Sequence, residues 1–104
     1  MQWVSKHISD QRIVTTSAFV SLKKCDTIKD NAGVYLFVDK DQDVKFIGKA
    51  GDGEMIAAIN KAINETNKTL GTVRLKALYT DSDESALSLK KDLLGIYRPA
   101  NNFK

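Results

Sequence analysis

The side chains with the clearest capacity for chemistry are one tyrosine, two lysines and one asparagine: Tyr35, Lys49, Lys90 and Asn102. A phenol can donate a hydrogen bond, and the ammonium group of a lysine can bind an anion such as phosphate. Each residue also has a structural interpretation. Tyr35 can pack as a strand aromatic, both lysines can be solvated at their tips, and Asn102 can hydrogen-bond the end of the chain.

Lys49 belongs to a glycine-rich segment, GKAGDG, that precedes an expected helix. The glycines can present backbone N–H groups to an anion at the helix start, but the carboxylate of Asp52 opposes that role. The segment is not a nucleotide phosphate loop, because no Gly-Lys-Ser or Gly-Lys-Thr follows. Lys49 is therefore either a solvated lysine or a single cationic contact.

Lys90 has an unusual place in the C-terminal segment. At about 100° per residue it falls inside the apolar side of a helix. A lysine there either extends along its stem to the surface or reaches a polar pocket, where it can bind phosphate. The apolar residues on that side are Ala86, Leu87, Leu89, Leu93, Leu94, Ile96 and Tyr97.

The composition limits metal and redox chemistry. One histidine, His7, and one cysteine, Cys25, exclude a zinc site of the usual nitrogen and sulfur ligands and exclude an internal disulfide. We interpret both residues as structural, and any metal would need carboxylates. We expect no cofactor, and a reducing, cytoplasmic location.

Charge and hydropathy leave several partners open. The 104 residues fit a single domain, 1–104, and the net charge of +3 is mildly basic, with both signs mixed along the chain. No apolar run approaches the roughly 20 residues of a membrane span, and the N-terminus lacks the apolar core of a secretory signal. DNA, RNA, a protein partner and self-association remain open, whereas we expect no membrane contact.

The elements that position these residues follow from the apolar pattern. Alternation predicts strands over 33–39, 43–48 and 72–79, and the turn-forming DKDQD makes the first two a hairpin. Apolar spacing predicts helices over 54–66 and 83–97. We expect an α+β fold in which helices flank a small, mainly antiparallel, three-stranded sheet.

The ends of these elements are less clearly marked in the sequence. Asp52 is the expected cap of the first helix, Asp81 or Ser82 caps the second, and Pro99 ends it. Residues 1–30 are hard to interpret, since RIVTTSAFVSL is typical of a strand but could also open a helix.

Gly33-Val34-Tyr35, Phe46-Ile47-Gly48, the step GKA and the ending YRPANN together resemble the GIY-YIG nuclease domain family. The closest likeness is to the N-terminal domain of the bacterial excision-repair endonuclease, over about residues 24–102. The resemblance implies an active site of two hairpin tyrosines, an arginine on the first helix and a glutamate on the last. The glutamate holds a divalent metal that stabilises the scissile phosphate, and a tyrosine helps to activate water.

Three of the four chemical positions implied by this resemblance are altered. Tyr35 is retained, but Phe46 replaces the second tyrosine, Ile56 the arginine and Lys90 the glutamate. Ile56 joins the apolar side of its helix as a core residue. An ammonium group cannot bind a metal cation and repels one. The retained scaffold positions are Gly48, Lys49, Pro99 and Asn102, and a shifted alignment offers only Asp92 or Glu84 as a poor substitute carboxylate.

We therefore expect a degenerate, non-catalytic domain that binds nucleic acid or phosphate through Tyr35, Lys49, Lys90 and Asn102. A protein-interaction or oligomerisation module is one alternative, and an active metal-dependent endonuclease with a rearranged site is another. An active enzyme needs an exposed carboxylate near Tyr35 and Lys49. A nucleic-acid binder needs its basic residues clustered on one face, and a protein-binding module needs an exposed apolar patch.

Overall fold

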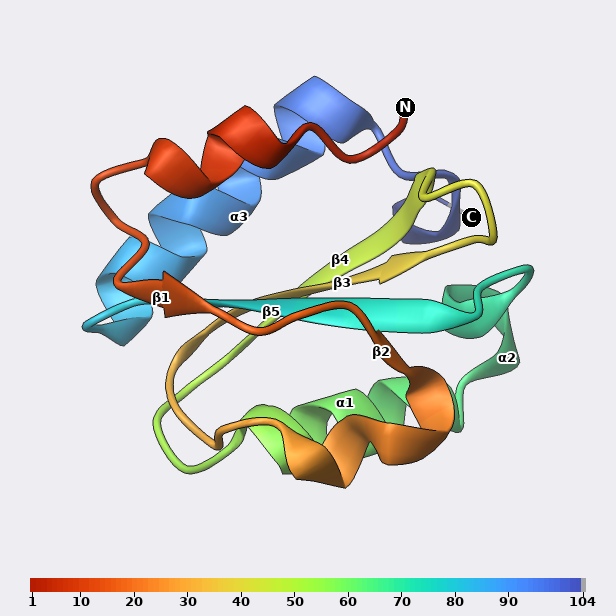
Figure 1. Cartoon of the computed structure of the whole chain (residues 1–104), viewed down its shortest axis with the longest axis horizontal. Helices are drawn as coiled ribbons and strands as arrows, with labels where there is room; N and C mark the ends of the chain where they lie inside the picture. The colour runs from red at the N-terminus through yellow and green to blue at the C-terminus, as the bar shows by residue number, and fades with distance from the viewer. Residues whose placement is uncertain (104) are drawn as a thin grey trace.

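An antiparallel sheet lies between two helical layers in the computed structural model, which describes residues 1–103 (Figure 1). At its centre, β3 (Gly33–Val38) forms a hairpin with β4 (Val44–Ala50), and β5 (Arg74–Tyr79) pairs with the other side of β3. The strand order β1-β5-β3-β4 leaves β4 at one edge. The predicted α+β class, hairpin and third strand are confirmed, with ends that differ by one or two residues.

Two short strands extend the sheet beyond the three that the sequence predicts. β1 (Thr15–Thr16) and β2 (Val20–Ser21) both pair antiparallel with β5. Each is only two residues long, too short to show an alternating pattern, so the predicted number of strands is wrong. The segment 12–22, which could have been strand or helix, contains both of these short strands, and only its last residue, Leu22, begins a 3-10 helix.

Each face of the sheet has its own helical layer. α1 (Met55–Ile63) and the 3-10 helix η2 (Leu22–Thr27) cover one face, while α3 (Asp83–Tyr97) and the 3-10 helix η1 (Ser5–Ser9) cover the other (Figure 1). The predicted helix 83–97 is confirmed. No helix within the described residues is long and apolar enough to cross a membrane.

The predicted helix 54–66 is confirmed over α1 but ends earlier, at Ile63. The chain leaves the helical conformation at Glu65 (φ −100°, ψ 102°), after α1, and resumes it in the one-turn α2 (Thr66–Thr69). A last 3-10 helix, η3 (Ala100–Asn102), follows α3, and both α2 and η3 contact β4.

The two faces of the hairpin build two separate cores. All six residues of β3 are buried, because helices cover both sides of the strand. Side chains on one face pack with α1, and those on the other face pack with α3. The first core includes Tyr35, Phe37, Phe46, Met55 and Ile59, and the second includes Val34, Leu36, Ile47, Leu89 and Leu93.

The buried side of α3 is narrower than the helical wheel predicts. Leu87 and Ile96 are exposed by 42% and 44%, and the buried residues are Ala86, Leu89, Leu93 and Tyr97. The Oγ atom of Ser82 caps the helix by accepting a hydrogen bond from the backbone N–H of Ser85, as one of the two expected caps.

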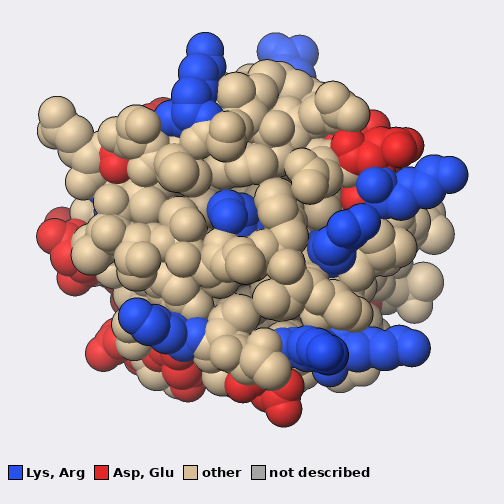
Figure 2. Space-filling view, in the orientation of Figure 1, with Lys and Arg blue, Asp and Glu red and all other residues tan. Residues whose placement is uncertain are grey.

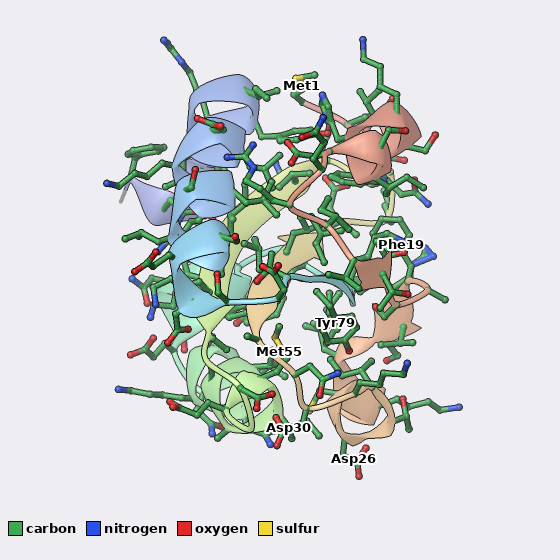
Figure 3. The ribbon with its side chains drawn as sticks, turned by 90° about the vertical axis from the view of Figure 1, so that its left-hand side faces the viewer. Met1, Phe19, Asp26, Asp30, Met55 and Tyr79 are labelled. Carbon is green, nitrogen blue, oxygen red and sulfur yellow. The ribbon has the colours of Figure 1, made fainter. Side chains whose placement is uncertain are left out.

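The cap of α1 comes from outside the helix. Asp30 lies beside the helix start, near Met55 (Figure 3), and its Oδ1 atom accepts a 2.9 Å hydrogen bond from the backbone N–H of Ile56. The predicted cap, Asp52, is exposed and makes no side-chain hydrogen bond within residues 1–103, so that prediction is wrong.

The N-terminal residues are attached to α3. The Trp3 ring stacks on Tyr97 with centroids 5.7 Å apart. The Tyr97 hydroxyl accepts a 3.0 Å hydrogen bond from the backbone N–H of Val4 and lies 2.5 Å from Nδ1 of His7. The Arg12 guanidinium bridges the segment to the Asp92 carboxylate at 2.8 Å. His7 is therefore a structural residue, as predicted.

Candidate functional site

Tyr35 extends across the hairpin toward the outer edge of β4. It pairs with Gly48 on that strand, and its ring occupies the space that a side chain at position 48 would fill. A Cβ atom added to Gly48 would lie 2.3 Å from both Cζ and the hydroxyl oxygen of Tyr35. Only glycine at position 48 leaves room for the Tyr35 ring, so this pair of residues determines where the phenol lies.

The surroundings of Tyr35 keep its phenol protonated. The residue is only 5% exposed. Burial, followed by the negative charge of Glu65, raises the pKa of Tyr35 to about 12. The hydroxyl can donate a hydrogen bond at neutral pH, but it is poorly suited to take a proton from water.

Phe46 preserves the aromatic wall of the site without its hydroxyl. Its ring lies 6.1 Å from that of Tyr35 and 5.7 Å from that of Phe37, centroid to centroid. The Nζ atom of Lys68, on α2, is 5.4 Å from the Phe46 centroid, a cation–π arrangement. The ring at the position where a second phenol is expected therefore contacts the ammonium group of Lys68 and has no hydroxyl to donate.

Three lysines from three elements gather beside β4. Lys90 of α3 is half-buried, and its pKa is lowered first by burial and then by the positive charges of Lys49, on β4, and Lys68, on α2. Lys49 follows Ile47 on the face of β4 that meets α3 and is exposed at its tip. We call Lys49, Lys68 and Lys90 the lysine cluster. Their combined positive charge favours the binding of an anion.

Glu65 partly balances this charge. Its carboxylate pairs with Lys68 three residues later, and the two side chains are 39% and 32% exposed. This is a partly exposed carboxylate near Tyr35, as an active enzyme would need. Its pairing with Lys68 leaves it a weak candidate for a cation.

Ile56 is not the core residue that the sequence predicts. It is half-buried and belongs to neither of the two core clusters. Its backbone N–H is the group capped by Asp30. The position where the resemblance places an arginine therefore carries an apolar side chain near the start of α1, without a polar role for that side chain.

Asn102 holds the edge strand. Its Oδ1 atom accepts a 2.8 Å hydrogen bond from the backbone N–H of Ile47, and its Nδ2 atom donates a 2.9 Å bond to the Ile47 carbonyl. These two bonds satisfy backbone groups that β4 turns away from β3. The amide thus positions β4, whereas a direct contact with phosphate stays a prediction.

The donor set does not fit the divalent metal that the resemblance implies. Lys90 stands where the carboxylate ligand is expected, and two further ammonium groups are close to it. Asp92 is paired with Arg12, and Glu84 is exposed in the first turn of α3. Within residues 1–103, no group of three His, Cys, Asp or Glu residues is arranged to hold a metal. We therefore derive no chemical step through a metal.

Comparison with known proteins shows that the chain is similar in sequence to two proteins with the same name. It is 32% identical over 84 residues to UvrABC system protein C of Mycoplasma capricolum, and 37% identical over 90 residues to UvrABC system protein C of Mycoplasma mycoides. These matches cover 77% and 80% of this chain but only 14% and 15% of the two relatives. No family model matches.

The structure brings together some of the predicted residues and adds others. Tyr35 and Phe46 share one aromatic group, and Lys49 and Lys90 share one electrostatic environment. Lys68 and Glu65 were not predicted as site residues, because the sequence NETNKT indicates only the end of a helix. Only the break at Glu65 and the return of the chain in α2 bring these two residues to the site.

Proposed function

We propose that the chain is a degenerate GIY-YIG-fold domain that binds the phosphate backbone of nucleic acid and does not cleave it. The similarity to UvrABC system protein C supports a nuclease-related origin and a DNA ligand. The observation that carries the proposal is the lysine cluster, which stands where a nuclease of this family would need a metal-binding carboxylate.

The cluster suits ground-state binding of an anion. A phosphate among Lys49, Lys68 and Lys90 would relieve the repulsion between their ammonium groups and raise the pKa of Lys90 again. The protonated hydroxyl of Tyr35 would add a hydrogen-bond donor on the same edge. Each of these contacts forms equally well in the ground state and in the transition state of cleavage. It therefore contributes to binding affinity but does not accelerate cleavage.

The distribution of charge favours a local site over a broad basic surface. Figure 2 shows the side of the molecule that carries β1, β2 and β5, where acidic and basic side chains are mixed. The lysine cluster comes from β4, at the opposite edge of the sheet, and from α2 and α3, which both contact β4. Binding is therefore expected to involve few phosphates and to weaken strongly with salt.

Lys90→Ala and Lys49→Ala test the proposal. Each should weaken binding of a labelled DNA or RNA oligonucleotide at low salt and reduce the slope of log K against log salt by about one, as expected for one lost phosphate contact. Both variants should remain folded, because neither lysine tip fills a core. Fluorescence anisotropy at several salt concentrations gives the affinity and the slope.

Lys23→Ala is the matched control. Lys23 is exposed on η2, which packs with α1, β2 and β5 rather than with β4, and its removal changes the net charge equally. This variant should bind nearly as wild type does. Equal losses in all three variants would indicate diffuse charge attraction, and wild-type protein that binds neither DNA nor RNA would refute the proposal.

A further inference from the structure

A shallow groove runs along the outer side of the C-terminal half of α3. It has a volume of about 500 Å³ and is lined by Lys91, Leu94, Gly95, Arg98 and Phe103. The walls combine apolar surface with two cationic side chains. Three of these residues are poor choices for stability at their positions, and folding alone does not account for them.

Gly95 is the first of these. It lies inside α3, where glycine costs helix stability relative to alanine. A Cβ atom added there would meet no other atom within 4 Å, so no close packing requires the glycine. What the missing side chain provides is a flat, open floor to the groove.

Arg98 and Phe103 are the other two. Arg98 ends α3 in the left-handed conformation (φ 45°, ψ 58°), which glycine adopts at much lower cost. Phe103 is 68% exposed, although a phenylalanine normally gains from burial. The first puts a guanidinium and the second an aromatic ring on the groove.

We propose that this groove holds an unstacked base of single-stranded nucleic acid, with the ring of Phe103 as its stacking surface and Lys91 and Arg98 beside the neighbouring phosphates. A flat base can approach the helix over Gly95, where any side chain would stand in its way. Aromatic stacking and flanking cations are the two recurring elements of single-strand binding. A duplex keeps its bases paired and stacked, and so cannot use the groove.

The groove adjoins the lysine cluster. Leu94, which lines the groove, lies one turn after Lys90 on the same side of α3, and Phe103 follows Asn102, which is hydrogen-bonded to Ile47 of the edge strand. One strand can therefore place a phosphate at the cluster and a base in the groove. This continuity with a phosphate site favours nucleic acid over an acidic peptide as the occupant. The inference rests on the proposed function.

Phe103→Leu is the main test, measured with a labelled oligothymidylate and with a duplex of equal length at low salt. The variant should lose about tenfold in single-strand affinity, as expected for one stacked base, while duplex binding stays unchanged. Phe103→Tyr keeps an aromatic ring and should bind the single strand as wild type does.

Gly95→Ala separates binding from folding. It should raise the Tm by a few degrees, because alanine is the better helix former, and it should weaken single-strand binding by raising the floor of the groove. A loss of affinity together with a gain in stability cannot come from misfolding.

The outcomes distinguish the two proposals. If Phe103→Leu and Gly95→Ala bind the single strand as wild type does while Lys90→Ala does not, the proposal that the groove binds a base is wrong and the proposal of the phosphate site is retained. If Lys90→Ala has no effect either, both are wrong. Binding of a Glu- and Phe-containing peptide at concentrations where oligothymidylate does not bind would assign the groove to a protein partner and overturn the inference.

Discussion

Tyr35 is the one member of the expected catalytic set that keeps its residue type, and its environment has made it a hydrogen-bond donor. The phenol is buried against Gly48 and Phe46, and the charge that raises its pKa is the negative one of Glu65. A phenol that activates water needs a lower pKa and a nearby cation to stabilise the phenolate. Here the retained tyrosine fits a binding role.

The pKa of Tyr35 predicts how stability depends on alkaline pH. Its folded-state pKa of about 12 lies above the ordinary tyrosine value of 10.0, so its contribution to stability is fully present below pH 10 and is lost as pH rises toward 12. Tyr35→Phe should therefore lose less unfolding free energy between pH 9 and pH 11 than wild type does. Urea unfolding at both pH values measures this.

The same comparison contains its own control. Burial also raises the pKa values of Tyr79 and Tyr97, and both remain in the variant. Their contribution cancels when the two proteins are compared at the same pH. Equal loss of stability in wild type and Tyr35→Phe would show that the phenol of Tyr35 titrates normally.

At the scale of the element, α1 depends on a residue that is distant in sequence. Asp30→Ala removes the side-chain acceptor of the Ile56 N–H and should lower the unfolding free energy by about 1 kcal/mol, the usual value of an N-cap. Asp30→Asn should restore most of this loss, because an amide oxygen can also accept. Chemical denaturation of the three proteins measures both effects.

Asp52→Ala is the matched control for this prediction. Asp52 is the cap that the sequence predicts, but it is exposed and takes no part in capping, so its removal should change stability by less than about 0.5 kcal/mol. A loss at Asp52 as large as the loss at Asp30 would contradict the assignment of the cap.

These two aspartates illustrate what the sequence can predict. The hairpin, β5 and α3 follow from alternation and apolar spacing, which are local properties. The cap at Asp30 and the strands β1 and β2 depend on contacts with residues 26 to 64 positions away, which no local pattern encodes. The exposed Leu87 on α3 shows the same limit, since the width of a buried face depends on what packs against it.

The candidate site was predictable to a similar extent. Tyr35, Phe46 and Lys90 come from the family resemblance, and the altered positions of the active site are visible in the sequence itself. Lys68 and Glu65 were not predictable, because their place depends on the break after α1 and on the packing of α2 against β4. The residues that the sequence did not predict are therefore those that only the tertiary structure brings to the site.

At the scale of the whole molecule, the fold separates a structural side from the candidate binding side. β1, β2 and η2 lie by β5 (Figure 1), whereas the lysine cluster draws Lys49 from β4, at the other edge of the sheet. Asn102 satisfies backbone groups on that edge, which limits strand-to-strand association there. Self-association and binding of a protein partner stay predictions.

The last prediction is that the protein has no nuclease activity and that one substitution does not restore it. Wild-type protein should not nick supercoiled plasmid with magnesium or manganese, because ammonium groups occupy the site expected for a metal. In Lys90→Glu, the new carboxylate would lie beside Lys49 and Lys68 and would pair with them instead of holding a cation. Phe46 and Ile56 would still lack the hydroxyl and guanidinium groups.

Two measurements check this prediction. Calorimetry should detect no manganese binding to wild type or to Lys90→Glu, and gel electrophoresis should detect no nicked plasmid with either protein. Lys90→Glu should also lose oligonucleotide affinity more strongly than Lys90→Ala does, because it adds a negative charge where a phosphate is expected. Metal-dependent cleavage by wild type that Tyr35→Phe abolishes would show that the site is catalytic after all. In that event Glu65, the carboxylate whose charge acts on Tyr35, would be the first ligand to examine.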